Sequence, residues 1–262
     1  MSGPGRIRVG VLATARACMQ ALFPPRCGAC GAFFQLRLDA WTDAAQGDLR
    51  AILAPLLCGA CLRRVVSLEP PLCPRCGVSF RGRSGPDRLC ETCRREPPPF
   101  AAARAAFAYE GPFRELVHAF KYRGRLRVGR VLGRCLEETW RRYSEAEGVE
   151  LVLPVPLHPQ RLRERGFHPV EQLLRGWPGP PVRHGVLIRL RPGPSQTGLD
   201  RAARRARVAG AFRVAEAEAV RGRRVLLVDD VLTTGATAAA CTEALLAAGA
   251  EGVAVLAAAR AL

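Results

Sequence analysis

Four pairs of cysteines, each with the spacing Cys-x-x-Cys, constrain the fold of this chain more than any other feature. Two intervening residues form a tight knuckle that directs both thiolates at one ion, and two knuckles complete a tetrahedron. Zinc suits such a set because it prefers four soft ligands and has no redox chemistry. The sequence therefore predicts two closed, structural Zn2+ sites with the ligands Cys27, Cys30, Cys58, Cys61, Cys73, Cys76, Cys90 and Cys93.

The alternatives for these cysteines are disulfides, a redox-active Cys-x-x-Cys and an iron–sulfur cluster. No export signal is evident, so we expect a cytosolic chain with reduced thiols, which disfavours disulfides. A redox motif normally occurs once beside a thioredoxin-like fold, not four times. Sequential and crossed pairing of the four knuckles both remain open. The three other cysteines stand alone at helical positions and are expected to pack in the core: Cys18, Cys135 and Cys241.

The character of the chain changes near residue 100. Residues 1–99 hold nine of the eleven cysteines and end in a stiff Pro97-Pro98-Pro99 connector. Residues 100–262 instead alternate strand-like segments (RAAFAYEG, GVELVLPVP, VLIRL, RRVLLVDD and VAVLAAA) with helical segments at 112–123, 126–143, 168–176 and 236–248. This alternation predicts an α/β domain whose parallel sheet is covered on both faces, preceded by a small zinc-ribbon domain.

The N-terminal segment IRVGVLATARACMQALF is apolar in places and is interrupted by Arg16. We interpret it as an amphipathic packing helix whose inward side chains are Val9, Leu12, Met19, Leu22 and Phe23. A membrane-surface anchor is the alternative, which would place a cytoplasmic chain at the inner membrane face. No run reaches the roughly 18 apolar residues that a membrane-spanning helix needs.

Charge favours a polyanionic partner. The formal net charge is +17, and Lys121 is the only lysine among 40 basic residues. Long-range electrostatics of this sign attract nucleic acid. Two basic stretches, 121–142 and 161–213, flank the expected ligand cleft, so we expect single-stranded DNA as a partner, bound without sequence specificity. Three aromatic residues are available for base stacking: Tyr122, Phe167 and Trp177.

The stretch VLLVDDVLTTGAT, residues 225–237, carries the most chemistry. A buried strand ends in Asp229 and Asp230, and ligands of parallel sheets bind at the carboxyl ends of strands. The following turn opens a helix and forms a phosphate cradle of amides and hydroxyls, from Thr233, Thr234, Gly235, Ala236 and Thr237. The carboxylates would repel phosphate, so we assign them to ribose hydroxyls and to a nearby Mg2+. A nucleoside-triphosphate P-loop is disfavoured because no lysine follows the glycine.

This stretch resembles the phosphoribosyl pyrophosphate (PRPP) signature of type I phosphoribosyltransferases. The segments GPFRELVHAFKYRGRL, LVLPVPLHPQRLRERGFHPVEQLL and QTGLDRAARRARVAGAF resemble the ComF competence-protein family. With the cysteine-rich part, the resemblance covers essentially the whole chain. It implies a phosphoribosyltransferase-like domain, PRPP with Mg2+ as ligand, and a role in DNA uptake during natural transformation, with a competence helicase or other DNA-processing proteins as partners. Some members are instead associated with sugar-acid utilisation.

Basic residues complete the expected site. Arg161 and Arg165, in a loop over 156–166, are the candidates to grip pyrophosphate, because guanidinium groups bind phosphate oxygens bidentately. Lys121 is the lysine that this chain retains, and the family resemblance of FKYRGR implies a role for it beside the substrate, so it is a candidate catalytic residue. His158 and His168 lie near that loop and are either donors or structural. For each arginine the alternative is a solvated surface charge.

Two further segments qualify the resemblance. The family usually has RGFNQ where this chain has Arg165-Gly166-Phe167-His168-Pro169, and an asparagine where it has Arg207. Proline removes a backbone donor, which puts the contacts of that pair in doubt. The arginine-rich run 201–213, with Gln196 and Thr197 before it, is interpreted as a lid or as a solvated basic helix.

Two functions follow from these residues. The first is a phosphoribosyltransferase that displaces pyrophosphate from PRPP through an oxocarbenium-like state, with Asp229 and Asp230 stabilising the sugar. No general base for the acceptor is evident. The second is a non-catalytic module that senses or holds PRPP while the zinc domain and basic surface hold DNA or a partner. A PRPP-responsive transcriptional regulator is disfavoured because nothing resembles a helix-turn-helix.

Overall fold

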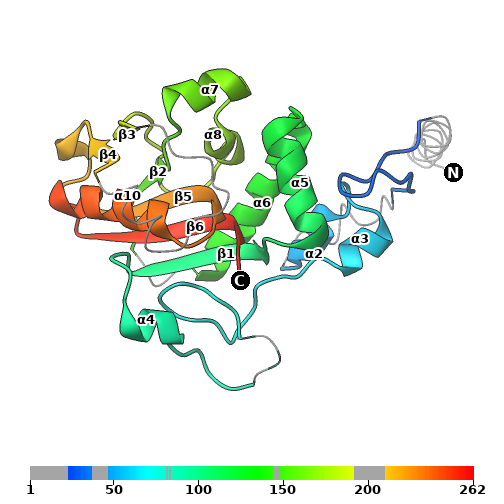
Figure 1. The fold of residues 1–262 in the computed structure, drawn as a ribbon, viewed down its shortest axis with the longest axis horizontal. Coiled ribbons are helices and arrows are strands. Elements are labelled where there is room, and N and C mark those ends of the chain that lie inside the picture. Colours follow the sequence, from blue (N-terminus) through cyan, green and yellow to red (C-terminus); the bar gives the residue numbers. More distant parts are fainter. Residues whose placement is uncertain (1–22, 37–46, 81, 83, 144–147, 192–209) are drawn as a thin grey trace, which may run out of the picture.

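A four-stranded parallel sheet forms the centre of the computed structural model (Figure 1). Its strand order is β1 (Ala102–Ala108), β6 (Gly252–Arg260), β5 (Arg224–Leu232) and β2 (Leu151–Pro154). These segments are nearly continuous apolar runs, as expected for strands covered on both faces. The structure describes residues 23–36, 47–80, 82, 84–143, 148–191 and 210–262.

Helices cover both faces of this sheet, which confirms the predicted α/β class. On one face, α5 (Gly111–Tyr122), α6 (Leu126–Tyr143) and α8 (Pro169–Leu173) bury their apolar sides in one core cluster. On the other face, the alanine-rich α10 (Ala236–Ala247) forms a second cluster with the opposite side of the strands. Small alanine side chains let this helix lie close to the sheet. Cys135 and Cys241 are fully buried, one in each cluster, as predicted.

One predicted strand lies outside the central sheet. The VLIRL segment forms β3 (Leu187–Arg189), which pairs antiparallel with β4 (Phe212–Val214) in a separate two-stranded sheet. The expectation of one parallel sheet for all strands is therefore wrong for this segment. Of its three residues only Leu187 is buried. The apolar pattern of such a segment indicates a strand but does not specify which strand it pairs with. A short 3-10 helix, Ala217–Ala219, follows β4.

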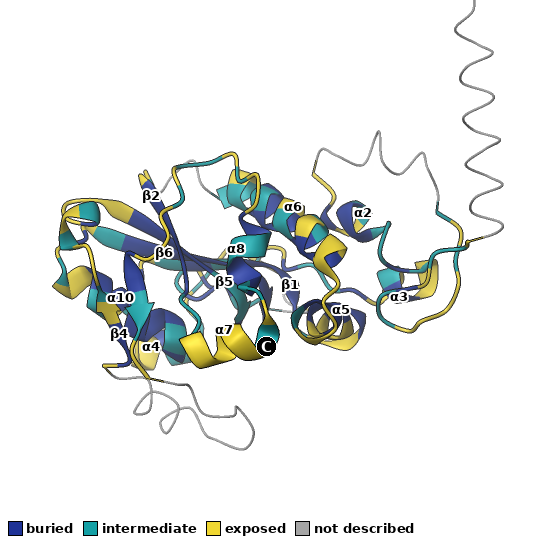
Figure 2. Cartoon of the chain, turned by 90° about the horizontal axis from the view of Figure 1, so that it is seen from above, coloured by how far each residue is buried: buried dark blue, intermediate teal, exposed yellow. Residues whose placement is uncertain are grey.

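The expected loop over residues 156–166 contains a helix, α7 (Pro159–Arg165). His158 is its N-cap, Pro159 stands at the first helical position, and Gly166 ends it with a φ of 77°. This is the favourable order of helix start and stop signals, with proline at the first turn and a left-handed glycine after the last. None of its residues is buried, and Figure 2 shows it as an exposed helix on the outside of the molecule.

The cysteine-rich part consists of two structural repeats. In each, the first knuckle lies between the two residues of a short antiparallel bridge, Arg26 with Phe33 or Leu72 with Ser79. The second knuckle starts a five-residue helix, which is α3 (Gly59–Arg63) in the first repeat and α4 (Glu91–Arg95) in the second. Between the knuckles of the first repeat lies α2 (Leu49–Leu53), capped by Asp48. The sequence shows this repeat only through its cysteine spacing.

Both repeats precede the expected boundary at residues 99 and 100, and each contacts a different part of the α/β unit that follows it. Cys27, Leu53 and Leu57 of the first repeat share a core cluster with α5 and α6. The second repeat has a small cluster of its own and lies below β1, where α4 is seen in Figure 1.

Several predictions from the sequence fall outside the described residues: the N-terminal helix up to Leu22, Cys18, the segment with Trp41, and most of the proposed lid, including Gln196, Thr197 and Arg207. Phe23 is described and its side chain is 73% exposed, so its predicted inward orientation is wrong. Phe23 directly precedes Pro24-Pro25, and a residue before proline disfavours helical backbone, so the predicted helical periodicity does not extend to Phe23. Among the described helices, none combines the length and hydropathy needed to cross a bilayer.

Candidate functional site

A cavity of about 370 Å³ opens at the carboxyl ends of β5 and β2. Its floor is formed by the end of β5 and the turn into α10, and its walls by α5, α7, α8 and β3. Parallel sheets bind ligands at this edge because loops from several strands meet there. The cavity is lined by all ten candidate catalytic and substrate-binding residues: Lys121, Arg161, Arg165, Asp229, Asp230, Thr233, Thr234, Gly235, Ala236 and Thr237.

The two carboxylates differ in their surroundings. The ammonium of Lys121, at the end of α5, donates to the Oδ1 of Asp230 at 2.7 Å, and both side chains are largely buried, with 16% and 14% exposed. Burial alone would lower the pKa of Lys121, but the charge and hydrogen bond of Asp230 raise it above its usual value. Lys121 therefore stays protonated and holds one of the two carboxylates in place.

Asp229 has no such ion pair with a described residue. Burial raises the pKa of Asp229 to about 7, the nearby charge of Asp230 adds to this, and Lys121 opposes it. Its Oδ1 accepts a hydrogen bond from the N–H of Asp230 at 2.8 Å. A carboxyl group that titrates near neutral pH is present there in both its protonated and its ionised form, and a pKa perturbed in this way is typical of functional sites.

The turn from Thr233 to Thr237 begins α10. Gly235 is the N-cap residue and has a φ of 79°, a left-handed conformation that glycine adopts without strain. The Oγ1 of Thr234 accepts from the N–H of Ala236 at 3.3 Å. The first N–H groups of a helix have no carbonyl partners within it, and the helix dipole makes this end positive. The turn thus presents amides and threonine hydroxyls to the cavity.

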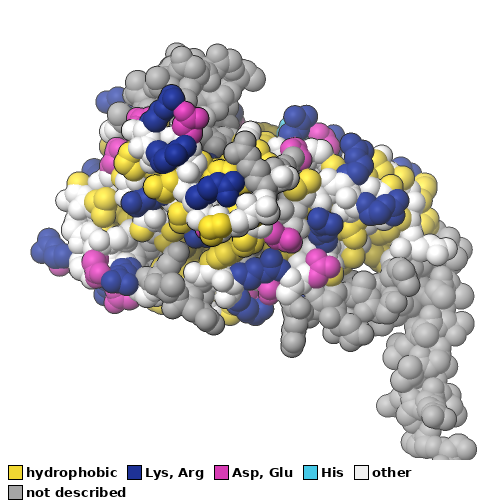
Figure 3. All heavy atoms as spheres, turned by 90° about the horizontal axis from the view of Figure 1, so that it is seen from below, with side chains coloured by type: hydrophobic (Ala, Val, Ile, Leu, Met, Phe, Trp, Pro, Cys, Tyr) yellow, Lys and Arg dark blue, Asp and Glu magenta, His cyan; other side chains and the backbone are white. Residues whose placement is uncertain are grey.

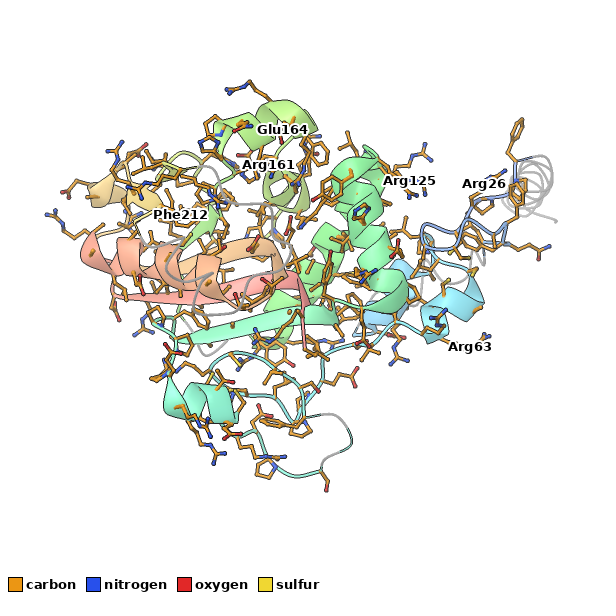
Figure 4. The ribbon with its side chains drawn as sticks, in the orientation of Figure 1. Arg26, Arg63, Arg125, Arg161, Glu164 and Phe212 are labelled. Carbon is orange, nitrogen blue, oxygen red and sulfur yellow. The ribbon has the colours of Figure 1, made fainter. Side chains whose placement is uncertain are left out.

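Three arginines line the cavity, and one of them was not predicted. Arg161 pairs with Glu164 at 3.0 Å on the exposed surface of α7, where Figure 4 shows the two side chains together. Arg165 lies over the ring of Tyr122, with its Cζ 5.1 Å from the ring centroid. Arg189 extends from β3 on the opposite wall, and burial lowers its pKa. The sequence signal for Arg189 was its position near the end of a strand.

Tyr109 is a second cavity residue that the sequence analysis did not identify. It follows β1, and its N–H donates to the carbonyl of Arg260 at 2.7 Å. Burial raises the pKa of its phenol, and the ammonium of Lys121 opposes that rise. Its place after a strand of the parallel sheet could have indicated it. The sequence does not show, however, that β1 belongs to the same parallel sheet as β5 and so ends on the same side as β5.

The departure from RGFNQ has a structural explanation. His168 is the N-cap of α8, and its Nε2 accepts from the N–H of Leu157 at 3.1 Å. Burial lowers the pKa of His168, which keeps the ring neutral and able to accept. Pro169 occupies the first position of α8, where the helix needs no N–H donor. The expected loss of a donor at Pro169 is therefore without consequence for the helix.

Of the three aromatic residues considered for base stacking, two are partly buried and pack against other rings. Phe167 lies 5.4 Å from Phe120 and Trp177 lies 5.8 Å from Trp140, in each case between ring centroids. Tyr122 is 63% exposed and lines the cavity. It alone of the three has an accessible ring, so the expectation is wrong for Phe167 and Trp177, because both belong to the border of the helical core.

The cysteines form two groups of four in sequential pairing, Cys27/Cys30 with Cys58/Cys61 and Cys73/Cys76 with Cys90/Cys93. Within each group all Sγ atoms lie within 4.8 Å of one another. The Sγ atoms of Cys30 and Cys58 are 3.8 Å apart, and those of Cys76 and Cys90 are 3.7 Å apart. A tetrahedral zinc with Zn–S bonds of about 2.3 Å requires sulfur atoms about 3.8 Å apart. Both groups fit the ion.

Local hydrogen bonds favour the thiolate form of one cysteine in each group, whereas burial raises the pKa of Cys61, Cys76 and Cys93. Although burial opposes it, N–H groups of Cys30, Cys58 and Ala29 lower the pKa of Cys27 to about 6. N–H groups of Cys76, Cys90 and Arg75 lower that of Cys73 to about 7 in the same way. All described cysteines are free thiols. Closed four-sulfur sites leave no position for water, so a zinc ion there would be structural.

Two solved structures are similar to part of this chain. The allosteric regulatory enzyme of purine biosynthesis matches 50% of this chain and 26% of its own, with 22% identity and a TM-score of 0.33. Phosphoribosylpyrophosphate synthetase from Mycobacterium smegmatis matches 48% and 33%, with 18% identity and a TM-score of 0.28. The chain thus spans about a quarter to a third of these enzymes. The phosphoribosyl transferase domain family matches residues 194–262.

Sequence relatives match much more of the chain. DNA utilization protein YhgH of Salmonella typhimurium is 31% identical over 205 residues, which are 76% of this chain and 88% of the relative. YhgH of Escherichia coli K12 is 30% identical with the same coverage. Competence protein F of Haemophilus influenzae is 29% identical over 212 residues, 78% of this chain and 90% of the relative. Together with the phosphoribosyl transferase domain, these matches show that the chain belongs to the ComF/YhgH family of DNA utilization and competence proteins.

Proposed function

We propose that the cavity binds PRPP together with Mg2+ and that the protein acts as a phosphoribosyltransferase-like protein in DNA utilization. One observation carries this proposal: a single cavity joins two strand-end carboxylates to a threonine turn at a helix N-terminus and to a basic wall. PRPP presents the complementary groups, which are ribose hydroxyls, a 5′-phosphate and a pyrophosphate. The match to a phosphoribosyl transferase domain over residues 194–262 supports the same ligand.

The 5′-phosphate would lie against the turn from Thr233 to Thr237. The amides at the start of α10 supply donors, the threonine hydroxyls supply more, and the helix dipole favours an anion there. Gly235 allows the backbone to approach the phosphate because no Cβ stands between them.

The ribose hydroxyls would donate to Asp229 and Asp230, next along the chain from the phosphate turn. Lys121 holds Asp230 in position from the opposite side. Binding of Mg2+ would favour the ionised form of Asp229, whose pKa of about 7 leaves it partly protonated at neutral pH. The bound cation would neutralise pyrophosphate oxygens and so assist their departure.

Arg165 and Arg189 are the cavity arginines for which the structure shows no ion pair with a described carboxylate, and we assign them to pyrophosphate. Arg161 can join them only by leaving Glu164. In a transfer reaction, the acceptor forms a bond to C1 of the ribose, the bond from C1 to pyrophosphate breaks, and the acceptor's proton passes to solvent. The protein would contribute orientation and charge stabilisation.

A row of arginines on α6 supports binding of single-stranded DNA. Arg127, Arg130 and Arg134 are exposed on the side of α6 opposite its buried face, and no described carboxylate pairs with them. They extend over about 10 Å of helix, beginning near the turn after Tyr122, where Arg125 projects outward (Figure 4). On the face shown in Figure 3, by contrast, basic side chains are spread among acidic and apolar ones. The row leads toward the exposed ring of Tyr122 at the cavity.

The relatives named DNA utilization protein and competence protein support a role in handling DNA. Counterion release from phosphates would drive the association, so the affinity should fall steeply with salt. Replacing Arg127, Arg130 and Arg134 together by glutamate should weaken single-stranded DNA binding and reduce its salt dependence, whereas Arg221→Glu, at an exposed residue just after the 3-10 helix, serves as control. Unchanged DNA affinity in the triple variant would exclude this row.

The test of PRPP binding and turnover uses purified full-length protein, Mg2+ and PRPP, with and without single-stranded DNA. Calorimetry measures binding, and a coupled assay measures pyrophosphate release. We expect Asp229→Ala/Asp230→Ala to abolish binding. No PRPP binding by the wild-type protein at millimolar concentration would refute the proposal.

A second candidate, binding of PRPP without transfer, is favoured by the groups that surround the cavity. Among described lining residues, Asp230 is engaged by Lys121, and the Nε2 of His168 accepts from Leu157. Among the lining residues that the structure describes, Asp229 is the one carboxylate left that could serve as a base for an acceptor. Tight PRPP binding without pyrophosphate release, in the presence of DNA, would identify this function.

A further inference from the structure

Tyr122 places an exposed aromatic ring at the cavity. It is the last residue of α5, it is 63% exposed, and it lines the cavity next to Lys121. Its ring lies against that of His118, one turn earlier in the helix, with 4.6 Å between the ring centroids. None of the core clusters of the described residues includes Tyr122. Core packing therefore does not account for a large aromatic side chain at this place.

The guanidinium of Arg165 lies over this ring, with its Cζ 5.1 Å from the ring centroid. Arg165 comes from α7, so the contact joins two walls of the cavity. No ion pair within the described part of the chain includes Arg165. An exposed cation–π contact changes an equilibrium constant by only about 2- to 5-fold. The ring therefore holds the guanidinium weakly.

Arg165 can leave the ring without disturbing the core. No residue of α7 is buried, and Gly166, directly after the helix, has open space where a Cβ would stand. The guanidinium lines the same cavity as the turn from Thr233 to Thr237. A phosphate group is a stronger partner than an aromatic ring, because it accepts two charge-assisted hydrogen bonds from one guanidinium. An anionic ligand in the cavity would therefore compete with Tyr122 for Arg165.

A tyrosine ring without its arginine suits one class of partner. Bases of single-stranded nucleic acid stack on aromatic side chains, and every base offers a flat π-face for this contact. The chain around Tyr122 carries the complementary charge. Arg123, Arg125 and Arg127 follow it and are all exposed, and residues 121–134 include no acidic residue. A single strand bound along this surface would bring its bases to the ring.

We propose that Tyr122 is a base-stacking site for single-stranded DNA, and that PRPP uncovers it by drawing Arg165 from the ring to pyrophosphate. This rests on the proposed function, since it takes PRPP as the ligand of the cavity. It adds a regulation of the same site, because PRPP and DNA then bind cooperatively. Such coupling is reciprocal, so DNA should raise the affinity for PRPP by the same factor as PRPP raises that for DNA.

The sign of the effect separates this coupling from simple electrostatics. PRPP carries negative charges, and Arg165→Met removes a positive one, so by charge alone both changes should weaken the binding of a polyanion. Uncovering of the ring predicts stronger binding in both cases. Arg163→Met is the matched control, because Arg163 is exposed on the same helix and is not among the residues that line the cavity.

The experiment measures binding of a short fluorescent oligothymidylate to the full-length protein by anisotropy, in Mg2+ with and without PRPP. Calorimetry first establishes whether PRPP binds. The variants are Arg165→Met, Arg163→Met, Tyr122→Leu, which removes the ring, and Tyr122→Phe, which keeps it. An abasic oligonucleotide of the same length has the same phosphates without bases and serves as the control ligand.

PRPP should raise the affinity of the wild-type protein for oligothymidylate by about 2- to 5-fold, and it should not raise that for the abasic strand. Without PRPP, Arg165→Met should bind oligothymidylate more tightly than Arg163→Met, and PRPP should give it no further gain. With PRPP present, Tyr122→Leu should lose about 5-fold or more in affinity, whereas Tyr122→Phe should retain it.

PRPP binding in calorimetry without a gain in DNA affinity would overturn the coupling and leave the proposed function standing. Absence of PRPP binding would refute the proposed function and the coupling with it. Equal effects of Arg165→Met and Arg163→Met, or an equal gain for the abasic strand, would also overturn the coupling, because Arg165 would then act by charge alone. Both positions lie outside the core clusters. Should Arg165→Met nevertheless not accumulate, Arg165→Gln and Arg163→Gln give the same comparison.

Discussion

Replacing Asp229 by asparagine should stabilise the protein at alkaline pH. The pKa of this carboxyl is about 7 in the folded protein and 3.8 in the absence of the fold, mainly because of burial. Between these values the folded state binds more protons than the unfolded state, so the free energy of unfolding falls as pH rises from about 4 to about 7. The sign is opposite to that of an ordinary salt-bridged aspartate.

The size of the effect follows from the shift. Three pH units correspond to about 4 kcal/mol as an upper bound. The Asp229 side chain is only partly buried and solvent screens its charge, so we expect about half, near 2 kcal/mol. Asparagine keeps the shape and an acceptor oxygen but cannot ionise. It should therefore remove this loss of stability while weakening the binding of a ribose and Mg2+.

The assay is urea denaturation of wild type and Asp229→Asn at pH 5, 7 and 8.5, with zinc present throughout. Part of the loss already falls between pH 4 and pH 5, so the asparagine variant should have some advantage at pH 5, and this should grow by about 1 kcal/mol more by pH 8.5. Glu251→Gln, at an exposed ion pair with Arg224, is the control and should show no such growth. A difference independent of pH, or one that favours aspartate at pH 8.5, would refute the burial argument.

Three other substitutions test the surrounding structure. Lys121→Met should lower the unfolding free energy by about 3 kcal/mol, because it leaves Asp230 buried without its cation. Lys121→Arg and Arg114→Met, at an exposed ion pair, should lower it by less. Equal losses of all three variants in urea denaturation would speak against a buried pair. Gly77→Ala should lower the unfolding free energy by more than the roughly 1 kcal/mol expected for an alanine in the left-handed region. Gly82→Ala is the control for that backbone cost, because Gly82 has a similar φ but open space around it. Equal melting temperatures of the two variants would argue against close packing of Gly77 on β1. His168→Ala should lower the unfolding free energy by about 1–2 kcal/mol, because the N–H of Leu157 loses its acceptor. His168→Asn should restore part of this loss in the same assay. No recovery with asparagine would indicate that the imidazole ring acts only by filling space.

Much of this structure could be predicted because its signals are local. A knuckle requires two cysteines at one spacing, and a strand followed by Asp229, Asp230 and a glycine turn specifies its own geometry within thirteen residues. Parallel strands then place such a turn at the ligand edge, whatever the rest of the sheet contains. Cys135 and Cys241 were likewise predictable, since apolar helix positions face the core.

What the sequence could not provide was proximity between distant segments. Lys121 meets Asp230 across 109 positions, and nothing in FKYRGR shows which carboxylate its ammonium reaches. Arg189 enters the cavity because β3 pairs with β4. Tyr109 enters it because β1 and β5 are parallel strands of one sheet, so their carboxyl ends lie on the same side. A local pattern records which face of an element is apolar, not which element covers it.

The sequence by itself thus determined the cysteine knuckles, the α/β alternation and the glycine turn after β5, because each depends on neighbours in the chain. Tertiary structure decided how the cysteine pairs combine, which aromatic ring remains exposed and which carboxylate is left without an ion pair. These depend on packing and burial, and burial raises the pKa of Asp229. Solvent exclusion is a property of the assembled fold, and no segment carries it alone.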